Sequence, residues 1–271
     1  DRPRAEQHHA GMDAAGMVLL GAGLLTGMLV ISYLGEKNAH IGSLAFAVPL
    51  VVAIVCVIAF VHHINNAVHP FIAPGLIYGP GFGTVNLVNA IYGGISSGSV
   101  ALIPLYAANR YGIDALGSGT LLIAQGAAAI LLSVAAALVL RRTGHRLPLY
   151  AGGITIALGL LLLALSPAAD VSPYVWLAGS AFLVGAGAGA LNPASRNAGL
   201  QLAPEHSSTL AALRSASLQI GSITTVSIVT ASLTGSGDPG RLQAWTFVAA
   251  ALLLVAFLPL IARVPEHRGS W

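Results

Sequence analysis

The stretch GAGAGALNPASR, residues 185–196, combines alternating glycines with an Asn-Pro pair and an arginine. Glycines in a loop let backbone N–H groups surround a phosphate, whereas glycines on a helix let a second helix approach closely. The spacing GxGxG differs from the dinucleotide pattern GxGxxG, and Gly185 and Gly189 lie four residues apart on one helical face. We therefore expect these glycines to pack helices together, with Pro193 loosening the helix end as a gating element.

A second set of candidates consists of uncharged polar residues at helical spacing within apolar segments. They are Asn86, Asn89, Gly93, Ser96 and Ser97 in one segment, Ser215, Gln219, Ser222 and Thr230 in another, and Gln125 and Ser133 in a third. These groups could contact a small organic substrate in a cavity, or they could only join helices by hydrogen bonds. Serine and threonine often bond back to their own helix. The amides Asn86, Asn89, Gln125 and Gln219 are therefore the better candidates for substrate contact.

Neither a metal centre nor a hydrolytic site is indicated. His62, His63 and His69 are close in sequence, but no cysteine or acid is placed to complete three or four converging ligands. No GxSxG motif occurs, and the lone cysteine, Cys56, lies in an apolar run where it cannot form an intrachain disulfide. We expect no metal, no cofactor and no enzymatic activity.

The composition indicates that these residues lie in a membrane. Hydrophobic residues make up 56% and charged residues 8% of the chain, and the mean hydropathy is +0.81. A soluble domain carries about 25% charged residues, so most of this surface must face apolar surroundings. The formal net charge of +3 does not indicate nucleic-acid binding, because no basic run is longer than Arg141-Arg142.

Eight runs are long and apolar enough to cross a bilayer as helices, and polar, turn-rich breaks separate them. They are approximately Ala14–Leu34, Ser43–Val61, Gly83–Ala107, Ser118–Leu140, Leu147–Leu165, Tyr174–Leu191, Thr209–Leu233 and Gln243–Ala262. The sequence therefore predicts an all-α polytopic membrane protein with about eight transmembrane helices.

The order of these runs predicts the domain organisation. Residues 14–61 form a helix pair, 62–82 form a cytoplasmic linker containing three prolines, and 83–262 form a bundle of six helices. Residues 1–13 and 263–271 are expected to be cytoplasmic tails.

The basic residues predict the orientation in the membrane. With the amino terminus inside, nine of the 12 Lys and Arg residues fall on the inner side, namely Arg2, Arg4, Arg141, Arg142, Arg146, Arg196, Arg214, Arg263 and Arg268. Lys37, Arg110 and Arg241 fall outside. This positive-inside bias places both termini in the cytoplasm, in the plasma or inner membrane of the cell. No Asp, Glu, Lys or Arg lies near the middle of a span, so a proton carrier is expected in protein that precedes Asp1.

Three segments resemble the major facilitator superfamily, and within it the fourteen-span drug:proton antiporters. They are GMDAAGMVLL (11–20), with an acid at the start of a helix, NLVNAIYGGISSGSVALIPLYAANRYGIDALGSGTLL (86–122) and RNAGLQLAPEHSSTLAALRS (196–215). The resemblance implies two six-helix bundles with an extra helix pair between them. This chain would then hold the extra pair and the second bundle, and the first bundle would precede Asp1.

One loop departs from the superfamily's pattern G-x-L-a-D-r-x-G-r-r. The matching stretch is ALVLRRTGHR, residues 137–146, which keeps Arg142, Gly144 and Arg146 but has Arg141 at the acidic position. In the family, that acid pairs with basic groups and latches the inward-closed side. This copy therefore gives no basis for predicting such a latch.

The resemblance implies a secondary active transporter that exports amphipathic organic compounds or drugs by alternating access, coupled to protons. Asn86, Asn89, Gln125 and Gln219 would contact the substrate in its cavity. The implied partners are the lipid bilayer, a small organic substrate and the amino-terminal six-helix bundle, without nucleic acid. The alternative is a non-transporting membrane module, a scaffold or receptor that retains the helix bundle.

Overall fold

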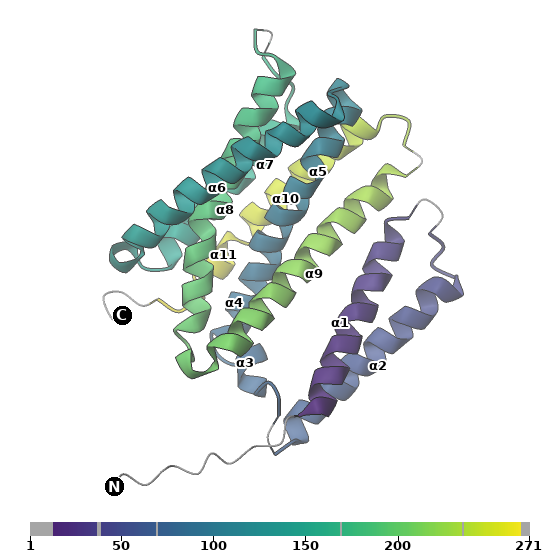
Figure 1. Cartoon of the computed structure of the whole chain (residues 1–271), viewed down its shortest axis with the longest axis vertical. Helices are drawn as coiled ribbons and strands as arrows, with labels where there is room; N and C mark the ends of the chain where they lie inside the picture. The colour runs from purple at the N-terminus through teal and green to yellow at the C-terminus, as the bar shows by residue number, and fades with distance from the viewer. Residues whose placement is uncertain (1–12, 37–38, 69, 169, 235, 267–271) are drawn as a thin grey trace.

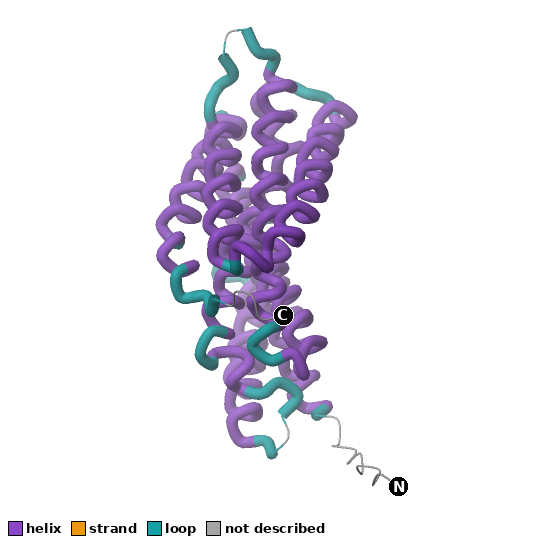
Figure 2. Tube along the Cα trace, turned by 90° about the vertical axis from the view of Figure 1, so that its left-hand side faces the viewer, coloured by secondary structure: helices purple, strands orange, loops and turns teal. Residues whose placement is uncertain are grey.

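The structure is a computed structural model that describes residues 13–36, 39–68, 70–168, 170–234 and 236–266. Within these residues every regular element is a helix, and loops connect the helices (Figure 2). Residues 1–12 and 267–271, which hold most of the predicted tails, lie outside the described residues. The same applies to Lys37 and His69, so the predictions for them are not addressed.

The long helices run alongside one another along the long axis of the molecule (Figure 1). The α-helices of the described residues, short ones included, are α1 (Ala14–Leu34), α2 (Leu44–Asn66), α3 (Pro74–Tyr78), α4 (Phe82–Val88), α5 (Gly94–Tyr111), α6 (Ala115–Thr143), α7 (Arg146–Ala164), α8 (Pro173–Leu200), α9 (Ser207–Leu233), α10 (Pro239–Ala256) and α11 (Leu258–Ile261). A π-helical segment, η1 (Asn89–Gly93), joins α4 to α5, and a 3₁₀ turn, η2 (Pro204–His206), precedes α9. In the described part of the chain, eight helices are long and apolar enough to cross a membrane. The predicted all-α polytopic fold is confirmed.

Capping side chains fix where several helices begin. Ser43, Asp114, Ser172 and Asp238 precede α2, α6, α8 and α10, and each accepts a hydrogen bond from a backbone N–H of the first turn. These N–H groups have no partner within the helix, so the caps satisfy donors that lipid could not. We call the opposite end of the molecule, where α1, α4, α7 and α9 begin, the inner end.

Several helices are longer than their apolar runs. α2 continues to Asn66, beyond the predicted Val61, and α3 lies within the predicted linker 62–82. α8 continues through Pro193 to Leu200, so this proline lies inside the helix and not at its end. A hydropathy window stops at polar residues, whereas a helix at the membrane edge continues as long as its backbone hydrogen bonds are made.

The helices divide into a pair and a bundle. α1 and α2 pack against each other at one side of the molecule, and α1 also contacts α9 (Figure 1). In the bundle, α8 packs against both α6 and α7, α5 against α9, and α10 against α7 and α5. Two buried tyrosines connect helices of this core by hydrogen bonds. Tyr92 donates to the Leu254 carbonyl and Tyr106 to the Leu163 carbonyl, both at 2.8 Å.

The glycines of residues 185–189 allow α8 to pack closely on two sides. A Cβ at Gly185 or Gly189 would collide with the backbone oxygens of Gln125 and Ala129 in α6. A Cβ at Gly187 would lie 2.6 Å from a backbone oxygen of α7. Small residues at such contacts let helix backbones approach within a membrane. Residues 185–189 are therefore the contact surface of α8 with both neighbours.

A hydrophobic cluster at the inner end fastens the helix pair to the bundle. We call it the linker cluster; its buried members are Phe60 and Ile64 of α2, Ile72, Leu76 of α3, Ala203, and Leu210 of α9. These residues come from parts of the chain separated by more than a hundred positions. Their packing joins α2, the 67–81 connection and the start of α9.

Asp13 makes a second attachment at the same end. Its carboxylate caps α1 by accepting from the Gly16 N–H at 2.9 Å, and it also accepts from the Phe71 N–H at 2.8 Å. His63 Nε2 at the end of α2 lies 2.8 Å from the same carboxylate. The two backbone donors stabilise the charged form and lower the pKa of Asp13 to about 2. One side chain thus connects α1, α2 and the segment after α2.

Candidate functional site

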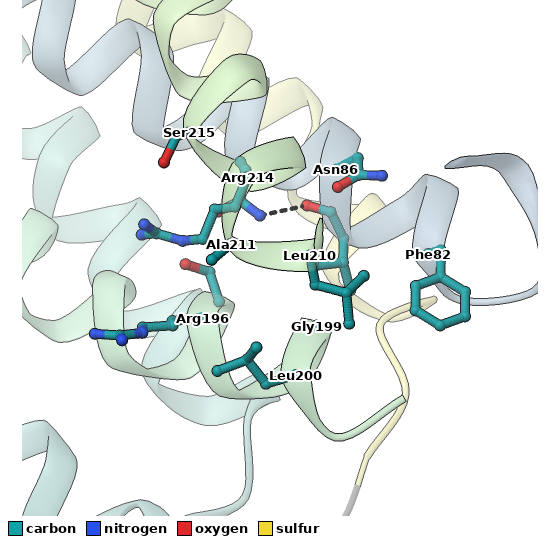
Figure 3. A pocket seen from close by; sticks show the side chains of 12 residues that line it. Phe82, Asn86, Arg196, Gly199, Leu200, Leu210, Ala211, Arg214 and Ser215 are labelled. Atoms are coloured by element: carbon teal, nitrogen blue, oxygen red, sulfur yellow. Dashed lines mark hydrogen bonds between the residues drawn. The ribbon is translucent and has the colours of Figure 1, made fainter. Parts of the chain in front are cut away.

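A cavity of about 280 Å³ lies at the inner end of the bundle, between α4 with η1, the last turns of α8 and the first turns of α9. We call it the α4–α8–α9 cavity (Figure 3). Its polar lining residues are Asn86, Asn89, Ser195, Arg196, Arg214 and Ser215, and its larger apolar ones are Phe82, Val85, Leu200 and Leu210. A cavity with an apolar wall and a few converging polar groups is typical of a small-molecule site.

Asn89 lies at the start of the π-helical segment and lines the cavity. Its side chain is 1% exposed. The Nδ2 amide donates to the Val85 carbonyl at 3.0 Å, whereas Oδ1 has no hydrogen-bond partner in the described structure. A buried carbonyl oxygen without a donor costs free energy. Asn89 therefore presents an acceptor that a bound molecule could satisfy.

Asn86 lies one turn before Asn89 and lines the same cavity. Its Nδ2 is 3.5 Å from the Leu76 carbonyl, which makes a long contact between α4 and α3. The structure thus brings together two of the four predicted substrate-contact residues, at the junction of the bundle with the linker.

Arg196 of α8 and Arg214 of α9 place two positive charges at this cavity. In Figure 3 both side chains extend to the same side of the cavity, away from Asn86 and Phe82. Arg214 is partly buried, and its Nη2 donates to Asn192 Oδ1 at 2.9 Å. From the sequence, both arginines are only markers of orientation. The overlooked signal was that Arg214 lies inside the predicted span Thr209–Leu233.

A strip of exposed polar side chains continues from the cavity along the bundle. Ser97 and Asn192 border a small neighbouring hollow between α5 and α8, and Asn192 reaches Arg214. On α9, Ser215 and Gln219 are exposed and one turn apart. Uncharged polar groups facing lipid are costly, so this strip is suited to face protein or water.

The other two predicted amides lie elsewhere. Gln219 does not line the cavity and lies on the exposed face of α9. Gln125 is partly buried, and its backbone oxygen packs against Gly185 in the contact of α6 with α8. Several α9 hydroxyls, including those of Thr225 and Thr230, donate to carbonyls four residues earlier in their own helix. For the Thr225 and Thr230 hydroxyls, the structure therefore shows hydrogen bonds within their own helix.

The predicted loop 137–146 is mostly helical, because α6 continues to Thr143 and α7 begins at Arg146. A carboxylate from the far end of the chain contacts the short turn between these two helices. Gly144 has φ +73°, a positive value that favours glycine, and ends α6. Glu266 Oε1 accepts from the His145 N–H at 2.8 Å, and Glu266 Oε2 is 3.6 Å from Arg146 Nε. Arg141 and Arg142 are exposed. An acid therefore pairs with this loop, but it comes from the segment after α11.

Within the described ranges, no three His, Cys, Asp or Glu side chains lie close enough together to hold a metal ion. His63, one of the histidines of the predicted linker, contacts Asp13 instead.

Comparison with known proteins identifies the family. The family model of the Major Facilitator Superfamily matches residues 85–271, from within α4 to the end of the sequence. A search among curated proteins finds no match. The matched region includes the six spans of the bundle and the whole α4–α8–α9 cavity except Phe82. The chain is an integral membrane protein that belongs to the major facilitator superfamily of transporters.

Proposed function

We propose that the chain forms the carboxy-terminal part of a proton-coupled exporter of amphipathic organic compounds, similar to the fourteen-span drug antiporters. The observation that carries this proposal is the α4–α8–α9 cavity. It offers the unpartnered carbonyl oxygen of Asn89 beside the apolar side chains of Val85 and Leu210. An amphipathic molecule could fill the apolar part and donate a hydrogen bond to the amide.

The proposed partner is an amino-terminal bundle of six further helices. The exposed polar strip supports this, because Asn192, Ser215 and Gln219 would otherwise face hydrocarbon. Packing against a second bundle would cover this strip and enclose the cavity between the two halves. Alternating access would then expose the cavity to each side in turn.

In this proposal residues 14–61 are the extra helix pair, 62–82 the cytoplasmic linker and 83–262 the second bundle. The start of the family match within α4 is consistent with a boundary there. The described arginines at the inner end are Arg141, Arg142, Arg146, Arg196, Arg214 and Arg263, against Arg110 and Arg241 at the opposite end. This asymmetry supports an inner end that faces the cytoplasm, in the plasma or inner membrane of the cell.

Proton coupling requires a titratable group within the membrane. The described acids are Asp13, Glu36, Asp114, Asp170, Glu205, Asp238 and Glu266, and all of them lie outside the α-helices. We therefore assign the proton carrier to the proposed amino-terminal bundle.

The test is flux through the full-length protein in proteoliposomes, using an aromatic carboxylic acid and its neutral amide, with and without a pH gradient. We expect faster flux with the gradient, and a loss of about tenfold in Asn89→Leu, because the substitution removes the amide acceptor. Asn109→Leu, at an exposed site at the far end of α5, is the matched control and should retain flux.

Two outcomes would contradict the proposal. Equal flux with and without the gradient would exclude proton coupling. No flux of either compound above that of protein-free liposomes would favour the scaffold or receptor alternative.

A further inference from the structure

Arg214 is a partly buried cation whose hydrogen bonding is incomplete. Its Nη2 donates to Asn192 Oδ1, but its Nε is buried without a partner in the described structure. The ion pairs among the described residues are His63–Asp13 and Arg146–Glu266. No described carboxylate therefore lies within 4.0 Å of a guanidinium nitrogen of Arg214. Taking a charge out of water without an opposite charge is costly, so this arrangement favours an anion.

Arg196 lines the same cavity, and its side chain lies on the same side as that of Arg214 (Figure 3). Two like charges beside one cavity repel each other unless an anion lies between them. Guanidinium groups present forked N–H donors that match the two oxygens of a carboxylate or phosphate. The Ser195 and Ser215 side chains, which also line the cavity, offer further hydroxyl donors.

The rest of the cavity constrains what must be attached to the anionic group. Asn89 Oδ1 is a buried acceptor without a partner, so it favours a ligand that carries an N–H or O–H donor. Phe82, Val85, Leu200 and Leu210 form an apolar wall. Together these groups match a small organic molecule with an acidic end, a nearby hydrogen-bond donor and an apolar body.

We propose that the α4–α8–α9 cavity binds organic acids, with Arg214 and Arg196 holding the acidic group and Asn89 accepting from an N–H or O–H next to it. This inference rests on the proposed function and narrows its substrate class from amphipathic compounds in general to amphipathic anions. A lipid phosphate offers the same oxyanion chemistry, so the experiment separates a dissolved acid from a headgroup.

The probes are 1-naphthoylglycine, which has a carboxylate, an amide N–H and an aromatic body, its neutral primary amide, and its N-methyl derivative. Binding to the full-length protein is measured by calorimetry in nanodiscs of phosphatidylcholine alone. We expect Arg214→Gln to weaken binding of the acid about tenfold or more, Arg196→Gln to weaken it less, and both to change binding of the neutral amide less than twofold. Arg214→Lys should restore part of the affinity, because it keeps the charge but not the fork.

The proposed hydrogen bond from the N–H of the ligand to Asn89 is tested separately. The N-methyl derivative should bind more weakly than 1-naphthoylglycine to the wild-type protein, and Asn89→Leu should abolish that difference. Arg263→Gln, at an exposed position of the inner end outside the cavity, is the matched control and should bind all three probes as the wild type does.

Three results would overturn the inference. These are an absence of 1-naphthoylglycine binding to the wild-type protein, equal effects of Arg214→Gln on the acid and its neutral amide, and an effect of Arg214→Gln only on the amount of phosphatidylglycerol that co-purifies. The last result would assign the arginines to a lipid headgroup. Flux of the neutral amide through wild-type proteoliposomes tests the transport proposal independently, so either proposal can fail while the other stands.

Discussion

At the scale of single residues, the burial and hydrogen-bond partners of a polar atom indicate the role of a residue better than its type does. Asn89 and Gln125 are both amides in apolar helices, but Asn89 presents an unpartnered side-chain oxygen to a cavity, whereas Gln125 does not line that cavity and its backbone oxygen packs against Gly185. The sequence predicted both as substrate contacts. An amide in an apolar helix needs a hydrogen-bond partner, but the sequence does not show whether that partner is a substrate or another helix. Arg214 was missed for the related reason that charge counting treats every arginine alike.

The residue for which a pH effect can be predicted is Asp13. Because its folded-state pKa is about 2, below the ordinary 3.8, the charged carboxylate stabilises the folded state. This contribution is fully present above pH 3.8 and is lost as the pH falls through about 2. We expect Asp13→Asn to lower the thermal unfolding temperature in detergent at pH 6, and the difference from wild type to shrink between pH 4 and pH 2.5.

Asp114→Asn provides the comparison, because Asp114 caps α6 through the Gly117 N–H alone. Its effect at pH 6 should be smaller than that of Asp13→Asn, which also disturbs the contacts to Phe71 and His63. An Asp13 effect of equal size at every pH would contradict the role assigned to its charge.

At the scale of elements, α8 is the helix on which the bundle is assembled. Glycines on two of its faces let it contact α6 and α7 at backbone distance, and its last turns form one wall of the cavity. The sequence predicted that the glycines pack helices, since the phosphate pattern was absent. It could not indicate that they serve two neighbours, because that depends on where α6 and α7 lie.

A matched pair of substitutions on α8 tests this packing. Gly185→Ala would place a methyl group against the Gln125 backbone oxygen, which cannot move aside like a flexible side chain. We expect a loss of about 1–3 kcal/mol in the free energy of unfolding, measured by SDS titration. Gly179→Ala has no atom within 4 Å of the added carbon, so it should stabilise α8 by up to about 1 kcal/mol. Equal stability of the two variants would exclude close packing at Gly185.

At the scale of the whole molecule, the helix pair meets the bundle where α1 contacts α9 and, at the inner end, through the linker cluster beside the cavity. The number and approximate place of the spans could be predicted, since each depends only on a local apolar run. The attachment could not, because Phe60 and Leu210 are 150 positions apart and their meeting in one cluster depends on the folded arrangement. Leu200 and Phe82 pack on the linker cluster and also line the cavity. The helix pair is therefore in a position to affect the site.

A double-mutant cycle tests whether the linker cluster joins the two parts. Phe60→Ala and Leu210→Ala should each lower the free energy of unfolding by about 2 kcal/mol, because a packing defect remains even where lipid replaces water. The double substitution should cost less than the sum, with a coupling above about 0.5 kcal/mol. Val55→Ala, on an exposed face of α2, is the control and should change stability little. Strict additivity would mean that Phe60 and Leu210 do not stabilise each other, and would contradict this role of the linker cluster.

The π-helical segment Asn89–Gly93 sets the two halves of its span out of phase. The Gly94 N–H bonds to the carbonyl of Asn89, five residues earlier, so this turn holds one residue more than an α-turn. One residue corresponds to a rotation of about 100°. Counting straight through the span at 100° per residue therefore misplaces the residues after Gly93, relative to Asn86 and Asn89, by about this angle. The extra residue lets α4 keep the rotation about its axis that turns Asn89 toward the cavity. At the same time, α5 keeps the rotation at which it packs against α9 and α10. A change of register in either half could thus be absorbed at this turn without being passed to the other.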